Sequence, residues 1–257
     1  MILDKIIETK KEEVEQLKKK TTISALEQTI AGLEPCRNIR QALSSEDCNI
    51  IAEVKCASPS RGRLIADFDP VRIAGVYEQN GAAAISVLTD EKYFAGYKNY
   101  LTQIRQKVKL PLLRKDFIID PLQIYETRAI GADAILLIVH VLGEKLTEFI
   151  LLSKELGLSS LVEVHTEEEL DLALAADAEI IGINNRNLDT FVTDIETSRK
   201  LRARIPEGFI VVAESGIMSR ADIDILMQAN IHAFLIGEAL ITAPDIGKKL
   251  RTFKGEK

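Results

Sequence analysis

Eight short apolar runs, separated by amphipathic helical patterns, constrain this chain more than any other feature. They are residues 49–55, 83–89, 110–116, 132–139, 160–165, 179–185, 209–215 and 232–238. Because each run is short and apolar on both sides, it is typical of a parallel strand that helices cover. Strands that alternate with helices indicate βαβ units. Eight such units in 257 residues predict an α/β protein with a closed (β/α)8 TIM barrel.

An open, doubly wound sheet is the alternative arrangement of the same units. A sheet of that kind that binds a dinucleotide carries the pattern GxGxxG after its first strand. No such pattern follows the first apolar run, which favours the closed barrel.

The residues before the first run contain two helical patterns, roughly at 3–20 and 23–32. This segment has no apolar core of its own, and no low-complexity linker follows it. We therefore expect one barrel domain over residues 1–257, with residues 1–45 as an N-terminal helical extension packed on it.

Composition excludes several classes of partner. The net charge of −6 disfavours a general affinity for nucleic acid or for an anionic membrane. No apolar run reaches the length of about 20 residues that a membrane span needs. The three cysteines form no CxxC pair, and the charged N-terminus lacks the apolar segment of a signal peptide. We expect a cytoplasmic protein.

Glu53 and Lys55 lie inside the first apolar run, two residues apart. Side chains at this spacing on a strand point to the same side, so an acid and a base share one face of a predicted core strand. Buried charges cost several kcal/mol unless they are paired, so this pair needs an explanation.

Polar residues also end the other runs. The carboxyl ends of barrel strands meet at one mouth, where the active sites of this fold lie. Alternation predicts that Glu53 and Lys55 face inward and Val54 outward, and that Glu214 faces inward with Val212. The candidate residues at these ends are Glu53, Lys55, Lys115, Glu163, Asn184, Arg186, Glu214, Ser215, Gly237 and Glu238.

Some charged residues near the same ends are expected to be structural. We place Arg114, Asp116 and His165 on the opposite face from the candidate residues, without a catalytic role. His140 and His232 are expected to be structural or surface residues. Three scattered histidines predict no metal site.

Two glycine turns follow the last two runs. Gly216 and Gly237 allow backbone N–H groups to approach an anion closely, and this end of a barrel often binds phosphate. Ser215, Ser58 and Ser60 can add hydroxyl donors. The pattern predicts a phosphate monoester as ligand; the alternative is that the glycines only tighten the turns.

Several long motifs occur in a fixed order along essentially the whole chain. They are AEVKCASPSRG, ISVLTDEKYFAG, LLRKDFIID, ADAILLI, LVEVH, GINNRNL, VAESGI and FLIGEAL. In these motifs the chain strongly resembles the indole-3-glycerol-phosphate synthase family of tryptophan biosynthesis. The resemblance implies a barrel lyase without a metal or organic cofactor. It also implies that 1-(2-carboxyphenylamino)-1-deoxyribulose 5-phosphate is converted to indole-3-glycerol phosphate, carbon dioxide and water.

The resemblance also implies catalytic roles. Lys115 matches the general acid of ring closure, and Glu163 matches the base of dehydration. Lys55 matches a second cation that binds substrate and can serve as an acid. Glu53 and Glu214 would hold the lysines and the substrate hydroxyls.

The remaining matched positions are expected to bind substrate. Asn184 and Arg186 match residues that line the anthranilate end and organise the catalytic network. An apolar wall would come from Phe94, Phe117 and Leu188. The phosphate end would be made by Ser58, Ser215, Gly216, Gly237 and Glu238, with Glu238 acting through its backbone N–H.

The expected partner is therefore a small phosphorylated substrate, with no nucleic acid and no membrane. We expect a monomer, with a homodimer as the alternative, and other enzymes of the tryptophan pathway as metabolic neighbours. Two rival functions stay open. One is another phosphate-binding barrel enzyme, such as a phosphoribosylanthranilate isomerase or an aldolase-like lyase that uses Lys115 in a Schiff base. The other is a barrel that binds a phosphate ligand without catalysis.

Overall fold

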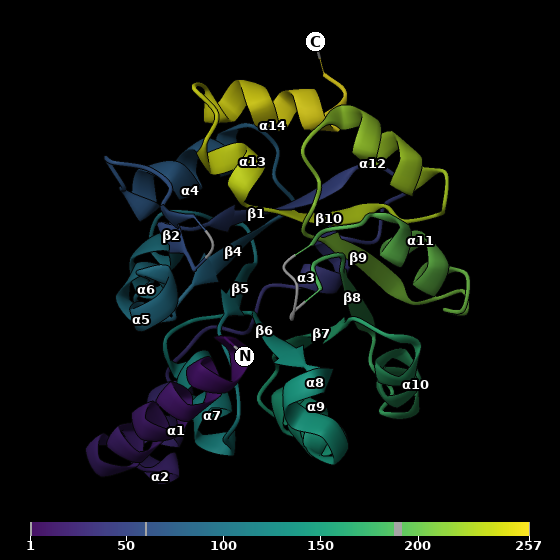
Figure 1. Ribbon diagram of the computed structural model, residues 1–257. Helices are drawn as coiled ribbons and strands as arrows, with labels where there is room; N and C mark the ends of the chain where they lie inside the picture. The colour runs from purple at the N-terminus through teal and green to yellow at the C-terminus, as the bar shows by residue number, and fades with distance from the viewer. Residues whose placement is uncertain (1, 60, 188–191, 257) are drawn as a thin grey trace.

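Eight parallel strands form a closed barrel in the computed structural model, which describes residues 2–59, 61–187 and 192–256 (Figure 1). The strands are β1 (Asn49–Val54), β4 (Ala84–Leu88), β5 (Leu112–Lys115), β6 (Ala134–Ile138), β7 (Ser159–Val164), β8 (Ile180–Asn184), β9 (Ile210–Glu214) and β10 (Ala233–Ile236). They follow one another around the ring in chain order, and β10 pairs with β1 to close it. The predicted TIM barrel is confirmed, and the open sheet is excluded.

Helices surround the ring of strands (Figure 1). After the strands come α4 (Pro70–Gln79), α5 (Glu91–Phe94), α6 (Lys98–Arg105), α7 (Pro121–Ala129), α8 (Val139–Leu142), the 3-10 helix η1 (Gly143–Lys145), α9 (Leu146–Glu155), α10 (Glu167–Ala175), α11 (Glu196–Arg202), α12 (Arg220–Met227), α13 (Glu238–Ile241) and α14 (Ile246–Lys254). The loop after β1 contains a small hairpin of β2 (Ala57–Ser58) and β3 (Gly62–Arg63). Among the described residues, no helix is both long and apolar enough to cross a membrane.

Alternation along the strands produces two apolar layers. One layer lies between strands and helices and includes Val54, Val211 and Ala213. The other fills the barrel and includes Leu161 and Val212. The predicted registers are therefore correct, and the same alternation turns the charged residues at the strand ends toward the barrel axis.

The N-terminal segment forms α1 (Ile2–Lys20), α2 (Ile23–Ile30) and α3 (Ile39–Ala42). Helices α1 and α2 lie beside α7 on the outside of the barrel (Figure 1). Lys10 of α1 is 1% exposed, and its Nζ lies 2.9 Å from a carboxylate oxygen of Asp90 and 2.9 Å from one of Asp116. A buried ion network thus fixes α1 beside the carboxyl end of β5.

Candidate active site

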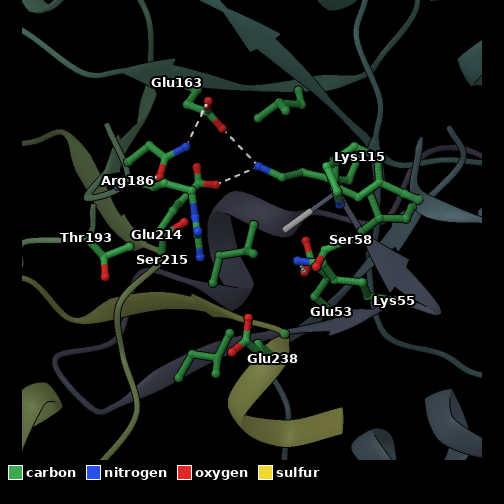
Figure 2. A pocket seen from close by; sticks show the side chains of 18 of the residues that line it. Glu53, Lys55, Ser58, Lys115, Glu163, Arg186, Thr193, Glu214, Ser215 and Glu238 are labelled. Carbon is green, nitrogen blue, oxygen red and sulfur yellow. Dashed lines mark hydrogen bonds and ion pairs between the residues drawn. The ribbon is translucent and has the colours of Figure 1, made fainter. Parts of the chain in front are cut away.

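A cavity of about 550 Å³ opens at the carboxyl ends of the strands (Figure 2). Strands β1, β5, β7, β8 and β9 each bring charged or amide side chains to it, from their last residues or the residue that follows. The six predicted catalytic residues all line it: Glu53, Lys55, Lys115, Glu163, Asn184 and Glu214. The structure therefore brings together residues that lie far apart in the sequence.

Lys115 is shared by two carboxylates. Its Nζ donates to Oε2 of Glu163 at 2.9 Å and to Oε2 of Glu214 at 2.7 Å (Figure 2). Burial on its own would lower the pKa of Lys115, but Glu163 and Glu214 outweigh burial and hold this pKa well above its ordinary value. Lys115 is therefore charged and is held in place by these two carboxylates.

Glu163 is held through both of its oxygens. Oε2 accepts from Lys115, while Oε1 accepts from Nδ2 of Asn184 at 3.2 Å and lies 3.3 Å from Nε2 of His165. Burial would raise the pKa of Glu163, but Lys115 and His165 together hold it below its usual range. Glu163 is thus ionised at neutral pH, as a base must be before it accepts a proton.

Glu214 has the opposite electrostatic balance. Burial, together with the negative charges of Glu163 and Glu53, raises the pKa of Glu214 to about 7, although Lys115 opposes this shift. The Lys115 ammonium therefore contacts two carboxylates, and their surroundings lower the pKa of Glu163 and raise the pKa of Glu214. Such a pair is typical of sites that perform acid–base chemistry.

Glu53 and Lys55 form a second ion pair across the cavity from Glu163 (Figure 2). Nζ of Lys55 donates to Oε2 of Glu53 at 2.9 Å. A Cβ on Gly237 would collide with the Glu53 carboxylate, so a larger residue there would force the buried Glu53 side chain to shift. The acid and the base of the first strand are thus paired inside the cavity.

One part of the cavity is apolar. The rings of Phe94 and Phe117 lie with their centroids 6.2 Å apart, and Leu136 and Ile138 of the barrel line the cavity with them. Ile2, Leu3 and Ile6 of α1 also line it. This wall suits a flat aromatic group. The predicted wall residue Leu188 lies outside the described residues, as does Ser60.

The predicted phosphate-end residues also line the cavity: Ser58, Ser215, Gly216, Gly237 and Glu238. Ser215 and Gly216 are consecutive residues with φ of 65° and 75°, in the left-handed region of backbone conformation. The carboxylate of Glu238 lies 3.1 Å from Nε of Arg61, a cation that the sequence analysis did not select. Arg186 lines the cavity as well, and its backbone N–H donates to Oδ1 of Asn184 at 3.0 Å.

Asn185 is a site residue that sequence reasoning missed. It is 2% exposed, and its Nδ2 donates to the backbone oxygen of Ser215 at 3.1 Å. Its Oδ1 accepts from the backbone N–H of Ser198 at 3.0 Å and from the Ser198 hydroxyl at 2.8 Å. Asn185 therefore ties α11 to the turn at Ser215. No sequence signal reveals such a tie, because it depends on where separate segments meet.

The placement of His165 on the opposite face from Glu163 is wrong. His165 follows Glu163 by two residues, so both side chains lie on the same side, and Nε2 of His165 reaches Oε1 of Glu163. Asp116 pairs with Arg114 at 3.1 Å, as expected of residues on the face opposite Lys115. Asp116 nevertheless also lines the cavity. Among the residues that the structure describes, no group of three or more His, Cys, Asp or Glu side chains could hold a metal ion.

Comparisons with known proteins give the family and the fold. The model of the indole-3-glycerol phosphate synthase family matches residues 3–253. The indole-3-glycerol phosphate synthase of Desulforamulus reducens is 49% identical over 255 residues, covering 98% of this chain and 96% of that protein. That of Chlorobium chlorochromatii is 52% identical over 242 residues, covering 93% of this chain and 94% of that protein.

A solved structure resembles this one in fold alone. The thiamine phosphate pyrophosphorylase of Pyrococcus furiosus aligns with a TM-score of 0.64 at 17% identity, over 85% of this chain and 96% of that one. The family assignment, by contrast, rests on similarity along nearly the full length. It confirms the resemblance that the motifs indicated and favours it over both rival functions. The chain belongs to the indole-3-glycerol phosphate synthase family, the carboxy-lyases of tryptophan biosynthesis.

Proposed function

We propose that the cavity at the barrel mouth carries out all three chemical steps of the synthase reaction on its phosphorylated substrate. The observation that carries this proposal is the position of the Lys115 ammonium between Glu163 and Glu214, in a cavity with an aromatic wall and glycine turns. The substrate's anthranilate ring would lie against Phe94 and Phe117. Its phosphate would lie at the turn of Ser215 and Gly216.

Lys115 acts as the general acid of ring closure. The ring carbon that bears the carboxylate attacks the ketone carbon, a carbon–carbon bond forms, and negative charge develops on the ketone oxygen. The Lys115 ammonium donates a proton to that oxygen and leaves a hydroxyl group. The neighbouring carboxylates keep Lys115 charged until this step.

Decarboxylation follows on the same ring carbon. The carbon–carbon bond to the carboxylate breaks, carbon dioxide leaves, and the electron pair restores the aromatic ring. An apolar surrounding favours this step, because it disfavours a carboxylate relative to neutral carbon dioxide. The wall around Phe94 and Phe117 provides such a surrounding.

Glu163 acts as the base of dehydration. It takes a proton from the carbon next to the ring nitrogen, the carbon–oxygen bond of the new hydroxyl breaks, and a double bond forms. The hydroxyl takes a proton from the Lys55 ammonium, or from Lys115 after solvent has returned the proton that Lys115 gave up in ring closure, and leaves as water. Asn184 donates a hydrogen bond to Oε1 of Glu163 and keeps this carboxylate in place while Lys115 moves to the substrate.

Other residues of the cavity position these groups. Glu53 holds Lys55 through the 2.9 Å ion pair, and Glu214 holds Lys115. Arg186 lies at the anthranilate end. The backbone N–H of Glu238 contributes to the phosphate end, because Arg61 already pairs with the Glu238 carboxylate.

We also propose that residues 1–257 act as one cytoplasmic domain and as a monomer. All six candidate catalytic residues come from one chain, so no second copy is needed to complete the cavity. The three cysteines are free thiols, which suits a reducing compartment. Sedimentation of the purified protein tests the monomer, since a dimer would double the mass.

Turnover of the substrate tests the proposed reaction. The chain has no tryptophan, so its own emission in the indole band is low. We expect the growth of indole fluorescence after substrate is added, with one carbon dioxide released for each indole formed. Binding of the substrate without either product would contradict the proposal and favour a non-catalytic barrel.

A further inference from the structure

We propose that His165 is a positioning residue that holds the base Glu163 in place and ionised during dehydration, and that Glu169 in turn holds His165. This inference rests on the proposed role of Glu163. It concerns a residue that does not belong to the described lining of the cavity and therefore acts through another side chain.

His165 lies between two carboxylates, Glu163 and Glu169, and Glu169 in turn contacts His140. Nε2 of His165 lies 3.3 Å from Oε1 of Glu163. Nδ1 lies 3.0 Å from Oε2 of Glu169, and the same oxygen accepts the backbone N–H of His165 at 2.7 Å. The other oxygen of Glu169 lies 3.0 Å from Nδ1 of His140, which is half exposed. Glu169 therefore fixes both the ring and the backbone of His165.

The surroundings of His165 favour a charged ring. Two carboxylates face it, Glu163 from β7 and Glu169 from α10, and His140 of α8 contacts the far oxygen of Glu169. Burial would lower the pKa of His165, but the contacts with Glu163 and Glu169 raise it to about 10. At neutral pH both ring nitrogens thus carry protons. The positive charge at Nε2 lies 3.3 Å from Oε1 of Glu163, an ion pair without the geometry of a hydrogen bond.

The need for this cation follows from what Lys115 does. Before the reaction, Glu163 is paired with Lys115 through Oε2. During ring closure Lys115 donates its proton to the substrate, and Glu163 loses its main counter-charge. His165 contacts the other oxygen and does not take part in that transfer. It therefore keeps Glu163 charged and oriented until Glu163 takes the proton from the substrate carbon.

A time course of the two products tests this role. Carbon dioxide leaves before dehydration, and indole fluorescence appears after it, so a weakened base lengthens the lag between the two signals in a single turnover. We expect His165→Ala to lower kcat about tenfold, less than the loss of a whole general base, with KM within about twofold of wild type. We expect Glu163→Gln to lengthen this lag more than His165→Ala does.

Matched variants separate positioning from folding. Glu169→Gln keeps the shape but removes the charge that holds His165, so it should lengthen the lag to a smaller degree. His165→Gln should fold even where His165→Ala does not, and should also show the lag. His232→Gln changes a histidine at the amino end of the barrel, where its backbone oxygen accepts the N–H of Asn49, and should leave the lag at its wild-type length.

The outcomes distinguish this inference from the proposed function. If folded His165→Gln and Glu169→Gln both keep the wild-type lag and kcat while Glu163→Gln lengthens the lag, the role of His165 is wrong and that of Glu163 stands. If the wild-type protein releases neither carbon dioxide nor indole, the proposed function itself is wrong.

Discussion

Glu214 is the residue of the cavity whose charge changes near neutral pH, because burial and its acidic neighbours raise its pKa to about 7. Below that pH Glu214 is protonated, and Lys115 pairs with Glu163 alone. Above it, the Glu214 carboxylate competes for the ammonium and leaves Glu163 freer to accept a proton. We therefore expect kcat to rise as the pH increases through about 7, and we expect Glu214→Gln to remove this rise.

The pH profiles of kcat for the wild type and for Glu214→Gln, measured across the neutral range, check this prediction. Ionisations of the substrate are common to both proteins and cancel in the comparison. An identical rise in both profiles would assign the ionisation to the substrate or to another residue.

The sequence predicted single residues well only where strand alternation applies. Glu53, Glu163 and Glu214 were placed inward correctly because they lie within strands whose apolar neighbours fix the register. His165 follows Glu163 by two residues, so the same alternation, continued one step past the end of β7, places it beside Glu163. Asn185 follows the end of β8, and its contacts depend on helix α11, whose position relative to the strand ends leaves no trace in the local pattern.

At the scale of elements, the turn after β9 depends on Asn185. Ser215 adopts φ of 65°, which costs a residue other than glycine about 1–3 kcal/mol unless its surroundings hold it. We expect Asn185→Ala to release this turn, to raise KM for the phosphorylated substrate several-fold, and to change kcat little. The free energy of unfolding should fall by about 1–3 kcal/mol, because buried partners lose their hydrogen bonds.

Steady-state kinetics and urea unfolding measure these two effects. Ser198→Ala is the control, because it removes one bond to Asn185 and leaves the bond from Asn185 to Ser215 in place. If Asn185→Ala altered kcat as strongly as KM, the residue would act on the chemistry and not on the phosphate end.

Helix α1 depends on Lys10 in a similar way. Lys10→Met would leave the buried carboxylate of Asp90 without its cation and Asp116 with Arg114 alone, and loss of one partner of a buried ion pair costs about 3–5 kcal/mol. We expect a lower free energy of unfolding in urea. KM should also rise, because α1 carries Ile2, Leu3 and Ile6 to the cavity.

Lys11→Met is the matched control for this prediction. Lys11 lies at the next position of α1, is 61% exposed and pairs with Glu8, so its loss should change stability by less than about 1 kcal/mol. Equal effects of the two substitutions would mean that the buried network does not fix α1. The sequence predicted the extent of this helix but not its anchor, because Lys10 and Lys11 look alike in a lysine-rich helix.

At the scale of the whole molecule, the barrel gathers groups from distant parts of the chain into one cavity. The fold alone does not fix the chemistry, since a protein with a different function aligns with a TM-score of 0.64 at 17% identity. The sequence predicted the ring of strands because apolar runs and helices alternate regularly. It could not predict the fine charge balance, which arises only when Lys115, Glu163 and Glu214 meet across the barrel axis.

Lys115→Ala in the indole fluorescence assay tests most directly whether Lys115 supplies the proton for ring closure. Loss of a general acid costs about 10²–10⁴-fold in rate, whereas Lys107→Ala, at an exposed lysine that precedes β5, should leave the rate unchanged. Binding of inorganic phosphate should survive in both variants, because the phosphate end lies at other residues. We expect indole emission to disappear in Lys115→Ala while phosphate still binds; indole emission at a near-normal rate in that variant would contradict the role of Lys115 as the general acid.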